Sequence, residues 1–413
     1  MSNQPKIAVI GAGVVGLCTA KNLQDQGFSV TLFDQQGIAE KCSKGNAGHF
    51  ATEQVFPLAQ ASLLKKLPGM LFNPNGPLRI DWRYLYKAFP WFFRFVCNMR
   101  KAKLTENTNA LKALNEPALS AYKALLGDQD FTDLITLNGS LLTFEDTPES
   151  DIEKLYQQYK QHNVAVKWLK GKSVFSIEPN LDKRVKNALL FTDVGHSINP
   201  YHLCQHIFSL FHRAHGEFQQ VGIKAIQTTD QNIALTTSDN TTHQFDKVII
   251  CTGAWSKYLT SQLGFNVPLD TERGYHAMIK NQSTLSRPVA SAERQFIITP
   301  MSEGLRLAGT VEFAGLDAPE NHHRATMLLK HAKALLSGID EKPPFDTWMG
   351  CRPSLPDSLP VIGRSPKHRN VYFGFGHQHL GLTQAAITAK LLTQLCSGEV
   401  PSLDLTPYRI DRF

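Results

Sequence analysis

The N-terminal segment of the chain alternates short apolar runs with a glycine-rich turn and an amphipathic stretch. Residues 7–10 (IAVI) form an uninterrupted apolar run, which is typical of a strand buried on both faces of a parallel sheet. A helical pattern follows to about Gln26, Gly27 ends it, and residues 28–33 form a second apolar run. The pattern predicts a strand, a helix and a second strand, as in doubly wound α/β domains.

Three glycines occupy the turn between the first strand and the helix, in the spacing G-x-G-x-x-G. Gly11 permits a tight turn, Gly13 lets a pyrophosphate approach the backbone, and Gly16 lets the helix pack closely on the strand. Asp34 ends the second strand 18 residues after the third glycine, where a carboxylate accepts hydrogen bonds from a ribose. This acid argues against a ribose 2′-phosphate, so the unit predicts a site for FAD or NAD. The candidate cofactor-binding residues here are Gly11, Gly13, Val14, Val15, Gly16 and Asp34.

Beyond residue 56 the alternation of strand and helix stops, and it returns in two later segments. Residues 56–130 have mainly helical spacing with several proline breaks, whereas residues 264–345 are rich in strand patterns. We therefore expect an α/β protein of two interleaved domains. The predicted cofactor domain comprises residues 1–55, 187–260 and 346–413, and the predicted substrate domain comprises residues 56–186 and 261–345.

The composition excludes several classes of protein. Hydrophobic residues make up 42% of the 413 residues and charged residues 19%, which is unlike disordered, collagenous or coiled-coil chains. The seven cysteines are odd in number, scattered and without a C-x-x-C pair. We therefore expect neither a disulfide framework nor a metal site, and we favour a reducing, cytoplasmic compartment. The longest uncharged stretch, residues 370–389, contains histidines and glycines and does not predict a membrane-spanning helix.

The net charge of +7 is concentrated in one part of the sequence. Residues 60–103 contain nine basic side chains and one acidic one, and also nine of the chain's 39 aromatic residues. Basic and aromatic residues at helix-like spacing are typical of a segment that lies on an anionic membrane surface. We expect peripheral contact there, on the inner face of the cell membrane; the alternative is an amphipathic helix packed on the substrate domain. No nucleic-acid module accompanies the segment, so we expect no nucleic-acid partner.

Seven short motifs occur in a fixed order along almost the whole chain. They are GAGVVG (11–16), FD (33–34), SKGNAG (43–48), VIICTGAWS (248–256), RGYH (273–276), CRPSLPDSLPVIG (351–363) and FGFGHQHLGLT (373–383). In these motifs the chain resembles the D-amino acid oxidase-like family of FAD-dependent oxidoreductases, and within it most nearly the D-amino acid dehydrogenase group. The resemblance implies a Rossmann-like FAD-binding domain of the GR2 type, with an inserted α+β substrate domain that contains a mixed sheet.

The resemblance also implies further contacts with FAD. SKGNAG matches the turn that runs beside the pyrophosphate and flavin, and VIICTGAWS matches a strand and turn that pass the cofactor. FGFGHQHLGLT matches the turn whose backbone N–H groups face the flavin pyrimidine and stabilise negative charge there. Ile223 matches the apolar position whose backbone meets the adenine. These further candidates are Ser43, Asn46, Ala47, Gly48, Ile223, Thr252, Gly253, Gly376, Leu380, Gly381 and Leu382.

The resemblance makes four side chains candidates for the substrate site. Arg352 matches the arginine that grips the amino-acid carboxylate, and a guanidinium is a planar, permanently charged fork suited to that role. Tyr275 is expected to close the pocket and His377 to line it; a purely structural role is the alternative for each. His49 departs from the group's pattern and is expected near the flavin ring. Cys351 is one residue out of register with the flavin-linking cysteine of sarcosine-oxidase-type relatives, so no covalent link is expected.

The resemblance implies dehydrogenation of a D-amino acid, cyclic ones such as a D-hydroxyproline included, by hydride transfer to flavin N5. The imine formed then hydrolyses to a 2-oxo acid. No protein base is needed, because the substrate amine only has to arrive neutral. A quinone or another electron-transfer acceptor is expected to take up the electrons. Two alternatives stay open: a glycine- or sarcosine-type oxidase that yields hydrogen peroxide, and a flavin-holding subunit without turnover of its own.

Overall fold

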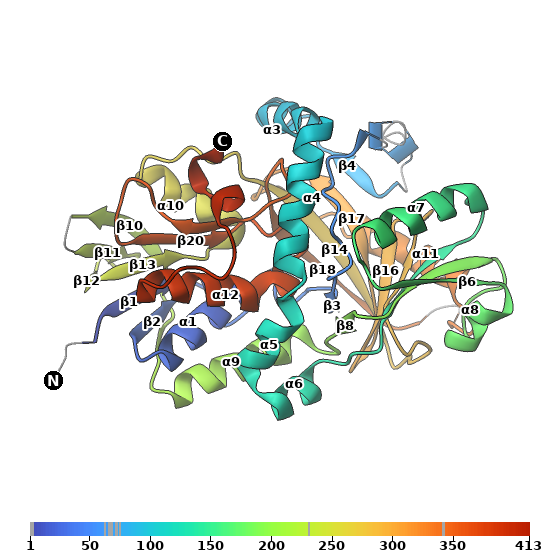
Figure 1. Cartoon of the computed structure of the whole chain (residues 1–413), viewed down its shortest axis with the longest axis horizontal. Coiled ribbons are helices and arrows are strands. Elements are labelled where there is room, and N and C mark those ends of the chain that lie inside the picture. Colours follow the sequence, from blue (N-terminus) through green and yellow to red (C-terminus); the bar gives the residue numbers. More distant parts are fainter. Residues whose placement is uncertain are drawn as a thin grey trace.

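The computed structural model consists of two large sheets side by side, each covered by helices (Figure 1). The structure describes residues 4–61, 63–64, 69–70, 73, 76–229, 232–340 and 343–413. Within these residues, a six-stranded sheet lies in the left half of Figure 1 and a nine-stranded sheet in the right half. The predicted α/β class with a mixed sheet is confirmed.

The six-stranded sheet contains the strand–helix–strand unit that the N-terminal sequence predicts. In spatial order its strands are β19 (Val361–Arg364), β20 (Val371–Phe375), β13 (Lys247–Ile250), β1 (Lys6–Ile10), β2 (Ser29–Phe33) and β9 (Glu217–Gln219). Neighbouring strands pair in parallel, except that β19 is antiparallel to β20. β1 lies at the centre because its apolar side chains are buried on both faces, as the uninterrupted run predicts.

Helices cover one face of this sheet and a small sheet covers the other. The helices on the first face are α1 (Val14–Asp25), α9 (Pro200–Arg213) and α12 (Gly381–Ser397), with α4 (Lys101–Asn115), α5 (Ala118–Leu126) and α6 (Asp128–Leu134) packed on the same core. The second face carries β10 (Ile223–Thr228), β11 (Ile233–Thr237), β12 (Thr242–Phe245) and α10 (Ser256–Gln262). Tyr122 of α5 is fully buried, and its hydroxyl donates to the carbonyl of Leu382 at 2.7 Å, which ties α5 to α12.

The nine-stranded sheet forms the other half of the molecule. In spatial order its strands are β18 (Phe345–Ser354), β14 (Asp270–Lys280), β17 (Gly304–Phe313), β16 (Phe296–Met301), β15 (Val289–Ser291), β5 (Ser140–Phe144), β7 (Asn187–Phe191) and β6 (Val166–Lys170), with β4 (Leu78–Ile80) beside β17. The helices α7 (Glu149–Gln161), α8 (Lys172–Ile177) and α11 (His323–Leu335) pack on this half, and β3 (His49–Phe50) pairs with β8 (Gly195–His196) between the two halves. Short 3-10 turns are η1 (Gly253–Trp255), η2 (Thr406–Tyr408) and η3 (Ile410–Arg412).

The strand pairing differs from the predicted domain boundaries in two places. β7 and β18 fall within the segments assigned to the cofactor domain, yet both belong to the nine-stranded sheet. β18 pairs with β14 over ten residue pairs, an interaction that no local pattern reveals. Conversely, α4, α5 and α6 come from the predicted substrate segment but pack with α1 and α12. We therefore propose boundaries after β7 and after β18, and the division into two domains stays a prediction.

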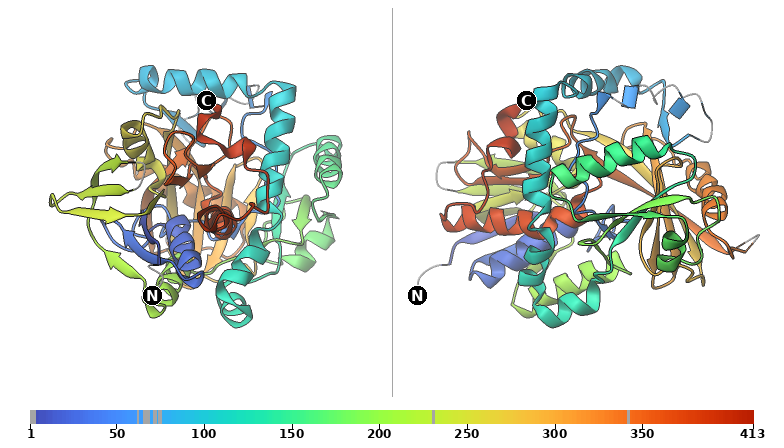
Figure 2. Two further views of the ribbon diagram at one scale, coloured as in Figure 1. Left: turned by 60° about the vertical axis from the view of Figure 1, so that its left-hand side comes forward. Right: turned by 45° about the vertical axis from the view of Figure 1, so that its right-hand side comes forward.

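A further helix, α3 (Leu85–Cys97), lies across one end of the molecule (Figure 2). Its inner side is held by Trp91, which is 5% exposed and donates from Nε1 to the carbonyl of Ser354 at 3.2 Å. Trp91 and Phe92 also contact the ring of Phe313 on β17. Most of the basic, aromatic segment at residues 60–103 is described by the structure, but Lys65 and Lys66 lie outside the described residues. Among the described helices, none is long and apolar enough to cross a membrane.

Candidate cofactor and substrate site

A cavity of about 630 Å³ lies where the two halves meet, at the carboxyl ends of β1, β13 and β20. This is the edge at which open α/β sheets bind their ligands. The structure brings most of the sequence-predicted residues to its wall. They are Gly11, Gly13, Val14, Val15, Asp34, Ser43, Asn46, Ala47, Ile223, Thr252, Gly253, Tyr275, Arg352, Gly376, His377, Gly381 and Leu382.

The glycine turn has the geometry that a diphosphate requires. Gly11 has φ +106°, and a Cβ on Gly16 would lie 1.8 Å from the carbonyl oxygen of Gly11. Helix α1 begins after Gly13 with no side-chain cap and no acidic residue in its first turn, so the positive end of its dipole is open to an anion. Ser43 joins the second predicted turn to this site, because its Oγ accepts from the N–H of Val14 at 2.9 Å.

Asp34 stands beside the glycine turn at the end of β2. Its carboxylate accepts from the N–H of Ala12 at 2.8 Å and from the N–H of Gln36 at 2.8 Å. These bonds fix the carboxylate in the cavity wall, and a carboxylate with its four lone-pair sites still accepts from a ribose hydroxyl. The residues of the turn and of β2 therefore fit the diphosphate and ribose of a dinucleotide.

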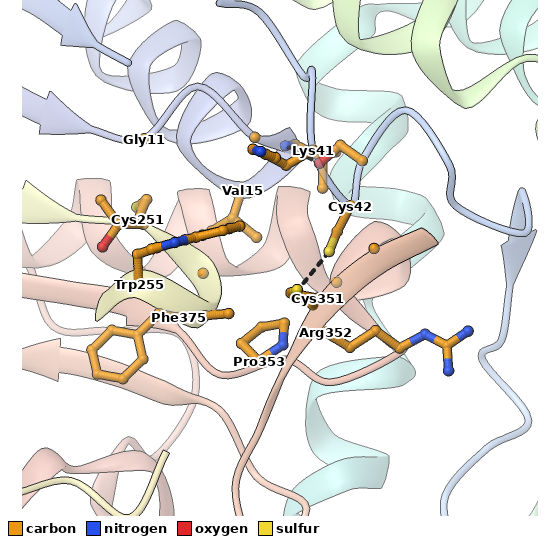
Figure 3. Close-up of a pocket in the computed structure, with 18 of the residues that line it drawn as sticks. Gly11, Val15, Lys41, Cys42, Cys251, Trp255, Cys351, Arg352, Pro353 and Phe375 are labelled. Atoms are coloured by element: carbon orange, nitrogen blue, oxygen red, sulfur yellow. Dashed lines mark hydrogen bonds between the residues drawn. The ribbon is translucent and has the colours of Figure 1, made fainter. Parts of the chain in front are cut away.

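Arg352 lies at the opposite side of the cavity, on β18. Its guanidinium lies over Gly274 of β14, where a Cβ would be 2.2 Å from Cζ, so the missing side chain makes room for it. Within the described residues it makes one long hydrogen bond, from Nη1 to the carbonyl of Thr310 at 3.4 Å, and no ion pair with a carboxylate. Figure 3 shows its side chain extending away from Cys351 and Pro353. The positive charge is left for an anionic ligand.

The nearest cross-strand neighbour of Arg352 is an acid that is engaged elsewhere. Glu272 is paired with Arg352 in register, but its Oε1 accepts from the hydroxyl of Ser354 at 2.6 Å. Ser354 in turn lies 3.3 Å from the amide nitrogen of Gln378. Burial raises the pKa of Glu272, although its hydrogen bond to Ser354 and the charge of Arg352 act in the opposite direction. Glu272 is thus bound by Ser354 and forms no ion pair with Arg352 in the described part of the chain.

Tyr275 lines the cavity, but its hydroxyl is occupied. It donates to Oε2 of Glu312 at 2.6 Å and accepts from the N–H of Asn321 at 3.1 Å. Burial, the bond to Glu312 and the charge of Glu312 raise the pKa of Tyr275 to about 12. The structure therefore favours the structural alternative for this residue, and its contact with substrate stays a prediction.

Two histidines of the turn before α12 also lie in the wall, and both are neutral. Nε2 of His377 lies 3.0 Å from Oγ1 of Thr388, and burial lowers the pKa of His377 to about 3. Nε2 of His379 lies 2.6 Å from Oε1 of Gln54, and burial together with the charge of Arg352 lowers its pKa to about 4. The predicted role of His377 in lining the pocket agrees with this placement.

Four predicted residues do not line the cavity, and the structure gives each a packing role. Gly16 packs on the carbonyl of Gly11, and a Cβ on Gly48 would lie 2.5 Å from the carbonyl of Ser197. Leu380 is buried and forms the N-cap of α12. His49 of β3 is paired with His196 of β8 and does not line the cavity. The roles predicted for these residues in binding or catalysis stay predictions.

His49 lies next to an acid in this buried position. Its Nε2 is 3.5 Å from Oε1 of Glu53, and both side chains are almost fully buried. Burial, with neighbouring His196 and His379, lowers the pKa of His49 to about 3, and burial raises the pKa of Glu53 to about 8. The short distance suggests an ion pair, but the cost of burying two charges keeps both groups neutral at pH 7.

Several residues of the cavity wall are not among those predicted from the sequence. Lys41 and Trp255 face each other across the cofactor end, with Nζ 5.5 Å from the indole centre, and Trp255 points into the cavity (Figure 3). His276 and Trp348 stack in the substrate end, with ring centroids 5.1 Å apart. Trp255 and His276 stand inside quoted motifs, whereas only the pairing of β18 with β14 brings Trp348 to the site.

The comparisons with known proteins agree with this site. The sequence profile of the DAO family, described as FAD dependent oxidoreductase, matches residues 6–395. The chain belongs to this family. A D-amino-acid oxidase from Bradyrhizobium diazoefficiens is 32% identical over 98% of each chain. A D-amino acid dehydrogenase from Paramagnetospirillum magneticum is 27% identical over 99% of each chain.

Solved structures share the fold of this DAO family member. Glycine oxidase from Geobacillus kaustophilus has a TM-score of 0.77 at 19% identity, with 99% of this chain and 100% of that one covered. L-Proline dehydrogenase from P. horikoshii has a TM-score of 0.72 at 16% identity, with 100% and 98% covered. The predictions of the family, of an oxidoreductase and of FAD as its cofactor are confirmed.

Replacement of Gly16 by alanine is expected to abolish tight FAD binding. Its Cβ would meet the carbonyl of Gly11 at 1.8 Å, and backbone cannot yield as a flexible side chain does. Such overpacking costs about 1–3 kcal/mol, which corresponds to about 5- to 150-fold in affinity. The ratio of flavin to protein absorbance after purification measures the effect. Gly338→Asn, at a position with no atom within 4 Å of its Cβ, is the control. A flavin content equal to wild type in Gly16→Ala would contradict the prediction.

Proposed function

We propose that the protein oxidises the Cα–N bond of a D-amino acid to an imine, which water then hydrolyses to a 2-oxo acid. FAD, when bound, supplies the hydride acceptor at N5 of its flavin. Support comes from the relatives, which are named D-amino-acid oxidase and D-amino acid dehydrogenase and align along almost the whole chain. A cyclic D-amino acid such as D-hydroxyproline remains one of the substrates to be tested.

The guanidinium of Arg352 is the observation that carries this proposal. It reaches the cavity wall without a carboxylate partner among the described residues, and Gly274 leaves space for it. A guanidinium and a carboxylate form two parallel hydrogen bonds, which fix both the position and the plane of the ligand. Holding the substrate in this way directs its Cα–H toward the cofactor, so that orientation supplies much of the rate.

An aromatic surface supports an acceptor at the membrane. We define the α3 surface as Trp82, Tyr86, Phe89, Phe93 and Val96, together with the basic Arg83, Lys87 and Arg94. Trp82 is 76% exposed, Tyr86 72%, and Phe89 and Phe93 63% each. Arg83 and Lys87 lie over the rings of Trp82 and Tyr86. Aromatic rings with basic flanks suit an anionic bilayer surface, so a quinone is the proposed electron acceptor.

Oxygen is the second candidate acceptor. The relative that is 32% identical is named D-amino-acid oxidase, and an oxidase would release hydrogen peroxide. The two candidates share the substrate step and differ only in what reoxidises the cofactor. They are therefore separated by one experiment on the same protein.

Anaerobic addition of single amino acids to the purified holoprotein tests the substrate class. One or more D-amino acids should bleach the flavin band near 450 nm, while the matched L-amino acids should not. The panel should include D-hydroxyproline and glycine. Reoxidation by a soluble quinone without peroxide indicates a dehydrogenase, and peroxide formation in air indicates an oxidase. If no amino acid of the panel bleaches the flavin, the proposal fails.

Replacement of Arg352 by lysine should weaken substrate binding and spare the cofactor. Loss of charge-assisted hydrogen bonds costs about 1.5–3 kcal/mol, which corresponds to about 10- to 100-fold in KM. Gly274→Ala should raise KM in the same direction, because its Cβ occupies the place of the guanidinium. The measurement is the dependence of flavin reduction on substrate concentration. An unchanged KM with normal flavin content in Arg352→Lys would rule out the carboxylate role.

The α3 surface should bind vesicles that contain anionic lipid. Cosedimentation with phosphatidylcholine vesicles that contain phosphatidylglycerol should exceed that with phosphatidylcholine alone, because each basic side chain near the surface contributes about 1 kcal/mol. Phe89→Ser with Phe93→Ser should abolish the binding. Val400→Ser is the matched control, since Val400 is 88% exposed but lies far from α3 in sequence. Equal sedimentation of the α3 variant and wild type would rule out the surface.

A further inference from the structure

His276 and Arg352 lie in the same small region of the cavity. On β14, His276 lies two residues after Gly274, so the two point to the same face of the sheet, about 6.6 Å apart along the strand. The guanidinium of Arg352 lies over Gly274 on this face. A carboxylate and an amine on one carbon span the gap between a group at Gly274 and a group at His276, with one hydrogen bond at each end.

The ring of His276 is held in one orientation. Its Nδ1 lies 3.1 Å from the carbonyl oxygen of Gly45, and a carbonyl only accepts, so Nδ1 carries the hydrogen. The ring stacks on its cross-strand partner Trp348 at an interplanar angle of 19°. Nε2 is therefore left with its lone pair free, and it has no hydrogen-bond partner in the part of the chain that the structure describes.

The imidazole is also neutral over the working range of pH. Burial lowers the pKa of His276 to about 3, and the charges of Arg306 on β17 and Arg352 on β18 act in the same direction. The bond to Gly45 opposes this shift without overcoming it. At pH 5–8 the ring is thus a hydrogen-bond acceptor that does not repel an amine, whereas a protonated ring would have no lone pair to offer.

We propose that Nε2 of His276 accepts a hydrogen bond from the substrate amine while Arg352 holds the carboxylate. The proposal rests on the proposed function, and it adds a second fixed point to the substrate. Two points of attachment on neighbouring groups leave the substrate free to rotate only about the line that joins them, which restricts the directions that its Cα–H can take.

The same contact strengthens during the reaction. As the Cα–H bond breaks, its electron pair leaves as hydride to the acceptor that FAD supplies, and the nitrogen lone pair forms the C=N bond. The nitrogen becomes positive, so its N–H becomes a stronger donor to Nε2 of His276, while the proton stays on nitrogen. An interaction that is stronger in the transition state than in the bound substrate raises the rate of the chemical step and not binding alone.

His276→Leu tests this role in the flavin-loaded protein. Leucine keeps an apolar group against Trp348 and removes the acceptor. Stopped-flow flavin reduction with the D-amino acid that bleaches wild type fastest should be slowed tenfold or more. The inhibition constant of the matched carboxylic acid without the amine, such as propanoate for D-alanine, should change less than twofold. Arg352→Lys should weaken the binding of both the amino acid and the matched acid. The two variants thus distinguish the carboxylate contact from the amine contact.

His276→Gln distinguishes loss of the acceptor from poor folding. The glutamine amide oxygen also accepts a hydrogen bond, so this variant should regain part of the rate of flavin reduction. His202→Gln, on the exposed side of α9, is the control for loss of a histidine. If His276→Leu weakens the binding of the amino acid and of the matched acid equally, the residue has a structural role and the proposal is overturned. Flavin reduction at the wild-type rate in His276→Leu would also overturn it. If wild type itself is not bleached by any amino acid, the proposed function has failed instead.

Discussion

The free edge of β18 is the constraint on which the site depends. β18 is the last strand of its sheet and pairs only with β14 among the described strands, so the carbonyls on its other edge need donors from elsewhere. Two of these carbonyls accept from other elements: Cys42 Sγ donates to Cys351 O (2.7 Å) and Gln378 N to Pro353 O (3.0 Å). At the end of the strand, Trp91 Nε1 donates to Ser354 O (3.2 Å). The strand that carries Arg352 is therefore contacted by the loop that contains Cys42, by the turn before α12 and by helix α3. These contacts fix the position of the strand from both halves of the molecule.

The electrostatics of the substrate end follow from this close packing. Burial lowers the pKa of His276, His377 and His379 far below neutrality, so these residues add no charge to the wall. Arg352 keeps its charge, and Glu272 behind it is bound to Ser354. Arg352, which has no carboxylate partner among the described residues, and the neutral acceptors beside it together recognise a ligand that has one carboxylate and a nearby hydrogen-bond donor. This division of roles explains how a site without an acid–base pair still orients an amino acid.

The sequence predicts local structure far better than it predicts pairing. The glycine turn and Asp34 reach the cavity as expected, because the strand–turn–helix unit is encoded within adjacent residues. Arg352, which the motif at residues 351–363 predicts, also lines the cavity. The contact of Trp348 with the His276 ring was not predicted, since it depends on the register between β14 and β18, which lie about seventy residues apart in the sequence. His49 pairs with His196 and does not line the cavity, and the role predicted for it near the flavin ring stays a prediction.

Helix α3 packs on the protein through one side and leaves a row of apolar side chains exposed on the other. The helix buries Trp91 against the substrate strand, yet Tyr86, Phe89, Phe93 and Val96 follow one another at intervals of three and four residues on its outer side. A helix that served only to cover β18 would place polar residues there, as water requires. Because Trp91 joins this outer surface to the carbonyl of Ser354, whatever covers α3 lies one helix away from the strand that holds the substrate. An acceptor that approaches with the membrane would thus meet the protein next to its site of oxidation.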